Sequence, residues 1–229
     1  MAALRRWAVP AAFVLGLAAW CVARSVWVDD ALHPWCNTLA GLVVLGLGFA
    51  VGLDRADLGL ERRDAARGLA YGAALWAVVA LVLVAAAALP ATRDALQDDG
   101  TIVSTGAMLR RTLIVIPLGT ALLEEAAFRG VLLGLLDRVT SAGRALVASA
   151  VVFGLWHLLP VWRGGGAGEL GDADGAGRFG AVAATFVATF VAGLAFGWLR
   201  QRSTSLIAPI AAHLATNSVV FVAAWSLAR

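Results

Sequence analysis

Apolar residues occur along this chain in long runs, separated by short polar or glycine-containing stretches. The runs lie near 7–28, 37–53, 67–90, 107–136, 142–162, 179–199 and 204–228. A helix needs about 20 mostly apolar residues to cross the hydrocarbon core of a bilayer. The pattern therefore predicts an all-α, polytopic membrane protein with about seven transmembrane helices, and it leaves little chain for a soluble domain.

The composition supports this fold class. Hydrophobic residues make up 61% of the chain and charged residues 14%, and the mean hydropathy is +0.83. Soluble domains contain roughly 45–50% apolar and about 25% charged residues. The net charge of +3 needs no nucleic acid partner to explain it. The two cysteines, Cys21 and Cys36, lack metal-binding or redox spacing and are predicted to be unpaired thiols.

The arginines predict the orientation of the helices, because cytoplasmic loops carry an excess of positive charge. With the N-terminus inside, the inner loops and span ends contain Arg5, Arg6, Arg55, Arg62, Arg63, Arg67, Arg138, Arg144, Arg200 and Arg202. The outer ones contain Arg93, Arg110, Arg111, Arg163, Arg178 and Arg229, and also the pairs Asp29–Asp30 and Asp98–Asp99. Arg24 and Arg129 lie within apolar runs and are not counted. The distribution favours a cytoplasmic N-terminus.

Polar and ionisable side chains lie inside the later runs and are almost missing from the earlier ones. They are Glu124, Glu125 and Arg129 in the fourth run, His157 in the fifth, and His213 and Asn217 in the seventh. A charged group in hydrocarbon costs several kcal/mol unless it is paired or faces a wet cavity. These residues are therefore the candidates for a functional site.

Their depth in the membrane can be estimated by counting from inner arginines. Glu124 precedes Arg138 by 14 residues, and His157 follows Arg144 by 13. His213 follows Arg202 by 11 residues. At about 1.5 Å per residue these depths agree to within roughly one helical turn, some 17–21 Å into the membrane. Three helices are thus expected to bring polar groups to one level near the mid-plane.

Helical spacing predicts how these side chains point. Glu125 and Arg129 are four residues apart with the acid first, which favours an ion pair that makes their burial tolerable. Glu124 points about 100° away around the same helix and is free for chemistry.

Two further pairs have the same four-residue spacing. Phe153 and His157 are expected to share one face of their helix, and His213 and Asn217 one face of theirs. Prolines within two turns of these sites can bend the helices and open a wet cavity. They are Pro117, Pro160 and Pro209.

These residue types supply the parts of a peptide hydrolase. A carboxylate beside an imidazole can activate water and return the proton to a leaving amine. A second imidazole and an amide can stabilise the oxyanion of a tetrahedral intermediate. The same set, Glu124, His157 and His213, is also a plausible catalytic zinc site with water as the fourth ligand. No H-E-x-x-H is present, and no serine or cysteine lies beside a histidine at matching depth.

Three motifs follow one another on the late runs: E-E-x-x-x-R (Glu124, Glu125, Arg129), F-x-x-x-H (Phe153, His157) and H-x-x-x-N (His213, Asn217). In this order they resemble the CPBP family, the CAAX prenyl protease and bacteriocin-processing intramembrane endopeptidases, also called Abi proteins. The resemblance covers roughly 105–228. It divides the chain into N-terminal transmembrane helices over 1–104 and a protease core over 105–229, within one integrated membrane domain.

The resemblance implies a role for each motif residue. Glu124 and His157 would activate the water, His213 and Asn217 would form the oxyanion site, and Arg129 would support Glu125. Phe153 belongs to the same motif set as a supporting residue. The family has been discussed both with zinc and without a metal, and we expect the reaction to need none.

The expected partners are the lipid bilayer and a membrane-associated protein or peptide substrate. The chain looks bacterial and is expected in the inner membrane. The substrate class remains open between a prenylated protein, a bacteriocin and a sorting-signal protein, and the oligomeric state remains open as well.

Two other functions are considered. A non-catalytic scaffold or self-immunity protein would be expected to lose some motif residues, and none is missing. A transporter would be expected to show an inverted repeat, and none is seen.

Overall fold

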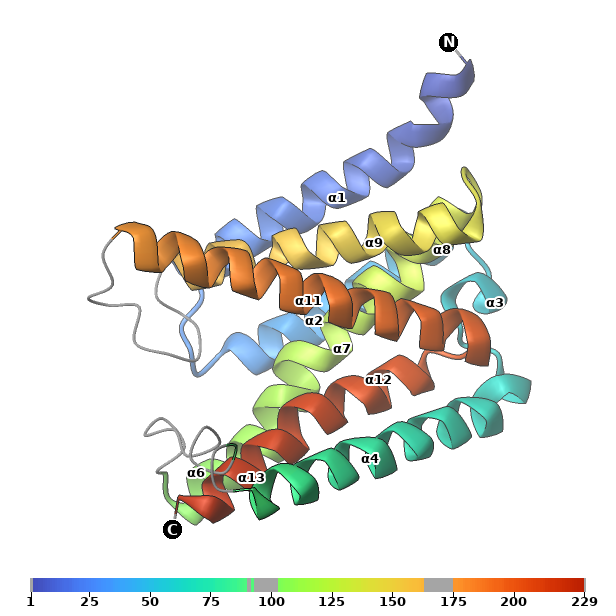
Figure 1. The fold of residues 1–229 in the computed structure, drawn as a ribbon. Coiled ribbons are helices and arrows are strands. Elements are labelled where there is room, and N and C mark those ends of the chain that lie inside the picture. Colours follow the sequence, from blue (N-terminus) through green and yellow to red (C-terminus); the bar gives the residue numbers. More distant parts are fainter. Residues whose placement is uncertain (1, 90–91, 93–102, 163–174, 229) are drawn as a thin grey trace.

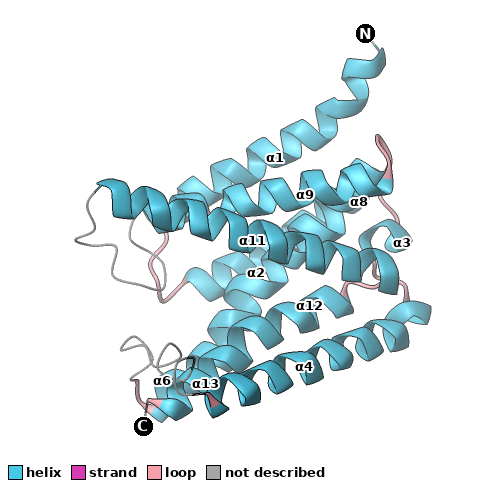
Figure 2. Cartoon of the chain, in the orientation of Figure 1, coloured by secondary structure: helices cyan, strands magenta, loops and turns pink. Residues whose placement is uncertain are grey.

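The computed structural model describes residues 2–89, 92, 103–162 and 175–228. Within these residues the regular elements are helices and no strand occurs (Figure 2). The first part contains α1 (Ala2–Trp27), α2 (His33–Ala50), α3 (Arg55–Leu58), η1 (Arg62–Asp64) and α4 (Ala65–Ala88). One segmented helix follows: α6 (Thr105–Arg110), η3 (Arg111–Val115), η4 (Pro117–Ala121), α7 (Leu122–Glu124), η5 (Glu125–Leu132) and α8 (Leu133–Asp137). The last elements are α9 (Ala142–Trp156), α10 (Leu158–Trp162), α11 (Gly175–Ser203), α12 (Ile207–Leu214), η6 (Ala215–Val219) and α13 (Val220–Leu227).

The predicted all-α membrane fold is confirmed, with six candidate spans in the described residues rather than about seven. They are Arg6–Trp27, Arg62–Ala88, Thr105–Asp137, Ala142–Trp162, Gly177–Ser203 and Ile207–Leu227. The expected span at 37–53 is the one not among them. Its helix, α2, has 18 residues, and its mean hydropathy is lowered by residues in its first two turns. They are His33, Pro34, Asn37 and Thr38. The outer-side residues Arg93, Asp98, Asp99, Arg163 and Arg229 lie outside the part that the structure describes.

The long helices run alongside one another in the bundle, and α1 begins and α13 ends at opposite ends of it (Figure 1). Helix α9 packs against α11, and α4 packs against α12. The segmented helix passes between these pairs. Every side chain of η5 is buried, which makes this segment the centre of the protein.

Helix α3 lies at the end of the bundle where α1 begins, and its position is fixed by capping and by hydrogen bonds to α11. Asp54 and Asp57 cap it reciprocally, and Gly59 ends it with a φ of +72°, a conformation that glycine adopts without strain. Arg200, near the end of α11, donates to the carbonyl oxygens of Ala56 and Asp57 at 2.9 and 2.8 Å. The chain between α2 and α4 is thereby fastened to the end of α11.

The segmented helix contains three π-helical segments, η3, η4 and η5. Such segments interrupt the regular hydrogen bonding of an α-helix and leave carbonyl groups that need other partners. In η3, the hydroxyl of Ser218 donates to the carbonyl of Thr112 at 3.2 Å. In η5, the hydroxyl of Ser149 donates to the carbonyl of Phe128 at 2.9 Å. Hydroxyls on neighbouring helices thus add hydrogen bonds to carbonyls of the π-helical segments, and the carbonyl of Phe128 also accepts from the backbone N–H of Leu133.

Side chains of α2 donate hydrogen bonds to carbonyls of η4. The amide of Asn37 donates to the carbonyl of Gly119, and the hydroxyl of Thr38 donates to that of Leu118 at 3.1 Å. Asn37 is fully enclosed, and its oxygen accepts a hydrogen bond from the indole of Trp20 on α1 at 3.3 Å. The polar residues that keep α2 out of the set of spans therefore hold the helix segment directly before Glu124.

Candidate active site

Glu124 is the last residue of α7 and is buried. Its Oε2 atom lies 3.7 Å from Nε2 of His157, the residue after α9, and 3.9 Å from Nε2 of His213 on α12. The prediction that three helices bring these groups to one level is confirmed. Neither distance is short enough for a direct hydrogen bond. Among the described residues, Oε2 of Glu124 accordingly has no hydrogen-bond partner, although it is shielded from solvent.

The sequence around His157 explains its position. Helix α9 ends at Trp156, and His157 forms the break before α10. Pro160 has no N–H to donate to the carbonyl of Trp156, which instead accepts a hydrogen bond from the thiol of Cys21 at 3.8 Å. The break leaves the His157 side chain about a quarter exposed, so the imidazole lies at the edge of the buried cluster.

Hydrogen bonding fixes which nitrogen of His157 carries its proton. Nδ1 lies 2.8 Å from the carbonyl oxygen of Phe153. A carbonyl can only accept, so Nδ1 is the donor, and Nε2 of the neutral ring is an acceptor facing Glu124. The ring also packs on Phe153 with centroids 4.6 Å apart. Phe153 and His157 therefore share a helix face, as their spacing predicts.

Glu125 has two partners. Its Oε1 accepts from Nη1 of Arg129 at 3.0 Å, which is the predicted ion pair. The same oxygen lies 2.8 Å from Nδ1 of His213. Glu125 thus links the arginine of its own helix to the histidine of α12, a contact that the spacing within one helix could not predict.

Aromatic rings enclose the buried guanidinium of Arg129. Its central carbon lies 4.0 Å from the centroid of Phe153 and 5.1 Å from that of Phe196. Phe196 also packs on His213 with ring centroids 5.4 Å apart. Arginine suits such a position because its planar, weakly hydrated cation can stack on aromatic faces while it hydrogen-bonds a carboxylate.

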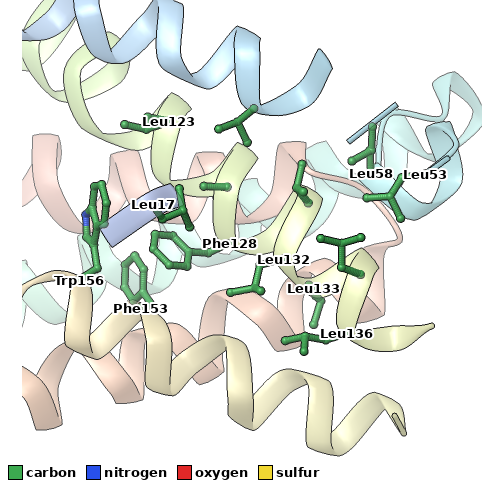
Figure 3. Close-up of a cluster of buried hydrophobic side chains, with 14 of the residues drawn as sticks. Leu17, Leu53, Leu58, Leu123, Phe128, Leu132, Leu133, Leu136, Phe153 and Trp156 are labelled. Atoms are coloured by element: carbon green, nitrogen blue, oxygen red, sulfur yellow. The ribbon is translucent and has the colours of Figure 1, made fainter. Parts of the chain in front are cut away.

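Trp156 is a site residue that the sequence patterns do not single out. Its indole N–H donates to Oε1 of Glu124 at 3.1 Å. The ring packs edge-on against Phe128, which in turn packs against Phe153 (Figure 3). A tryptophan within an apolar run is most simply a packing residue, so only its place directly before His157 could have drawn attention to it.

Asn217 lies on the π-helical segment η6, which begins two residues after His213. Its side-chain oxygen accepts from the hydroxyl of Thr216 at 3.4 Å, and the residue is half-buried. Among the described residues, no hydrogen bond joins its amide to Glu124 or either histidine. The shared face expected for His213 and Asn217 assumes α-helical spacing, which η6 interrupts.

The zinc alternative requires Glu124, His157 and His213 to act as one ligand set. In the part of the chain that the structure describes, no group of three or more His, Cys, Asp or Glu side chains is arranged to hold a metal ion. Oε2 of Glu124 lies 3.7 and 3.9 Å from the two imidazole nitrogens, farther than the roughly 3.3 Å between two ligands of a tetrahedral zinc, so the three donors do not fit the metal as they stand. The chemistry considered below therefore uses only the protein's own groups and water.

Comparison with protein families identifies the region that holds this site. Residues 106–219 match the family described as type II CAAX prenyl endopeptidase Rce1-like. The match contains all seven motif residues, from Glu124 to Asn217. No curated protein and no solved structure gives a match. The chain belongs to the CPBP family of CAAX-type intramembrane proteases.

Proposed function

We propose that this multi-pass membrane protein is an endopeptidase that hydrolyses a peptide bond of a membrane-associated protein or peptide. The water would be activated by Glu124 together with His157. One observation carries the proposal: Oε2 of Glu124 is buried, has no hydrogen-bond partner in the described part of the chain, and lies 3.7 and 3.9 Å from two imidazole nitrogens. A buried, unpaired carboxylate oxygen is costly in a structural role and is suited to bind a water.

The separation between Glu124 and His157 suits a shared water. A gap of 3.7 Å is too long for a direct hydrogen bond, and one water can bridge it. That water would donate one proton to Oε2 of Glu124 and the other to Nε2 of His157. Its oxygen lone pair is then free to attack the carbonyl carbon of the peptide bond. Glu124 takes the proton and later returns it to the amine nitrogen as the carbon–nitrogen bond breaks.

His213 is the proposed donor to the oxyanion. Its Nδ1 faces the Glu125 carboxylate, which accepts hydrogen bonds, so Nδ1 carries a proton. To act as this donor, Nε2 must carry a proton as well, so that its N–H can bind the developing negative oxygen. The Glu125 carboxylate holds the ring in place through Nδ1.

Asn217 is proposed as a second donor to the oxyanion. Among the described residues, its amide is bound through its oxygen, by Thr216, and its NH₂ group is proposed to bind the substrate. Phe153 and Arg129 keep their supporting roles, since the ring lies over the guanidinium that pairs with Glu125.

We further propose that the protein lies in a bacterial inner membrane with its N-terminus in the cytoplasm. The positive-inside distribution of arginines supports this orientation. In Figure 1, α1 begins at the same end of the bundle as α3 and the end of α11, where Arg200 and Arg202 lie. Prenylated proteins, bacteriocins and sorting-signal proteins are the substrate classes to be tested.

The test is cleavage of a lipid-embedded peptide library by the purified protein, with Glu124→Ala, His157→Ala and His213→Ala alongside. We expect the native protein to cut some peptides and each variant to lose most of the activity. Absence of cleavage by the native protein, or equal cleavage by folded variants, would leave a non-catalytic scaffold as the function. Glu61→Ala, on the loop between α3 and η1, serves as a control that removes a carboxylate outside the site.

A further inference from the structure

Arg24 is a cation in a membrane span that the chemistry above does not use. It lies on α1 within the span Arg6–Trp27, one turn before the end of the helix. A charged side chain inside a span is costly unless it is paired or functional, whereas an arginine near a helix end can extend its charge towards the membrane interface. Among the described residues no carboxylate lies within ion-pair distance of Arg24, and its buried Nε atom has no hydrogen-bond partner.

The position of Arg24 connects it to the candidate active site. Its guanidinium carbon lies 5.8 Å from the ring centroid of Trp156, the residue whose N–H holds Glu124. It also lies beside the thiol of Cys21, which donates to the carbonyl of Trp156. Arg24 thus lies over the face of the indole whose N–H, at the ring edge, binds Glu124, and His157 is the next residue along the chain.

Among the described residues, this arrangement leaves Arg24 without a carboxylate partner, one residue contact away from the proposed catalytic Glu124. Both residues contact Trp156, and among the described residues no ion pair joins Arg24 to Glu124, so the guanidinium does not neutralise that carboxylate directly. The side chain is half-buried, which keeps it accessible to a ligand while its charge is poorly screened. A guanidinium in such a position can bind a planar anion through two parallel hydrogen bonds. The planar anion that a peptide carries is a carboxylate.

We propose that Arg24 binds a carboxylate group of the peptide substrate and so determines which peptides are cut. The inference rests on the proposed peptidase function and adds a specificity-determining residue to it. The carboxylate comes either from the C-terminus of the substrate or from an acidic side chain near the cleaved bond. An extended peptide advances about 3.3 Å per residue, so the anion would lie only a few residues from that bond.

The experiment compares versions of one cleaved peptide, incorporated in a nonionic detergent that carries no phosphate. One version has a free C-terminal carboxylate, one a C-terminal amide, and one has its acidic side chains replaced by their amides. The proteins are the native chain, Arg24→Gln, Arg24→Lys and the control Arg63→Gln. Arg63 is a suitable control because it lies on η1, directly before α4, and its side chain is 78% exposed.

For the native protein and Arg63→Gln, we expect kcat/KM to be about tenfold higher for the peptide with the carboxylate that Arg24 binds than for the version with an amide in its place. Arg24→Gln should cut both at the same low rate, and Arg24→Lys should keep part of the preference because it retains the charge. Loss of preference with the C-terminal amide identifies the terminus as the source, and loss with the side-chain amides identifies an acidic residue.

Two results would overturn the inference while leaving the peptidase proposal intact. The native protein could cut all three peptide versions equally well, or Arg24→Gln could lower every rate by the same factor. The second result would assign Arg24 to helix packing or to lipid phosphates instead. If the native protein cuts no version of any library peptide, the proposed function itself fails.

Discussion

The indole N–H of Trp156 donates to Oε1 of Glu124 at 3.1 Å, and this bond fixes which carboxylate oxygen is left for water. Trp156→Phe removes the donor but keeps a ring to pack against Phe128. We expect kcat to fall about tenfold, because a misoriented base is less effective, while KM stays near its native value. Steady-state kinetics on a cleaved peptide provide the measurement.

A matched control is Trp162→Phe, since that ring lies on α10 and is 47% exposed. It should leave both constants unchanged. Equal effects of the two tryptophan variants, or a change confined to KM, would contradict a role of Trp156 in orienting Glu124.

Arg129 is expected to be indispensable for stability because it pairs with a carboxylate that has no access to solvent. In Arg129→Met the Glu125 charge loses its partner, and we expect the free energy of unfolding to fall by about 3–5 kcal/mol. The double variant Glu125→Gln, Arg129→Met should recover part of that loss, because it buries no unpaired charge. Denaturant unfolding in detergent measures both, and a loss below about 1 kcal/mol in the single variant would argue against the pairing.

Asn37 connects α1 and α2 to the helix segment before Glu124. Asn37→Leu leaves the carbonyl of Gly119 and the indole of Trp20 without their partner, so we expect a loss of stability of about 1–3 kcal/mol. Activity should fall too, since η4 leads directly into α7. Leu39→Ala on the same helix is the control, because Leu39 is 63% exposed. A smaller loss for Asn37→Leu than for Leu39→Ala would refute the link.

The metal requirement is testable on the same preparation. We expect cleavage to persist after treatment with a strong chelator and elemental analysis to find no stoichiometric zinc. A stoichiometric metal that is lost in His157→Ala, together with loss of cleavage on chelation, would reverse this expectation and make Glu124, His157 and His213 a ligand set.

The sequence patterns predict the spans and the cluster because the bilayer imposes both. Runs of about 20 apolar residues are needed to cross it, and polar groups inside such runs are rare enough to be recognised. The pairing of Glu125 with Arg129 follows from helical spacing alone. Helix α2 is the exception, since its Asn37 and Thr38 form hydrogen bonds to another helix that no local pattern reveals.

The remaining features depend on contacts between distant segments. The bond from His213 to Glu125 joins residues 88 positions apart, and that from Trp156 to Glu124 joins residues 32 apart. The π-helical segments cannot be predicted from a pattern that assumes 3.6 residues per turn. This matters most for Asn217, whose predicted face assumes a regular helix, whereas η6 is not one.

The central claim is that Glu124 activates the water that cleaves the peptide bond. Glu124→Gln tests it most directly, because the amide keeps the size of the side chain and its oxygen can still accept from Trp156, but it cannot take a proton. The measurement is the cleavage rate of one identified peptide under saturating conditions, with unfolding curves to show that the variant is folded. We predict a decrease of about 10²-fold or more. A folded Glu124→Gln protein that cleaves within about threefold of the native rate would contradict the account.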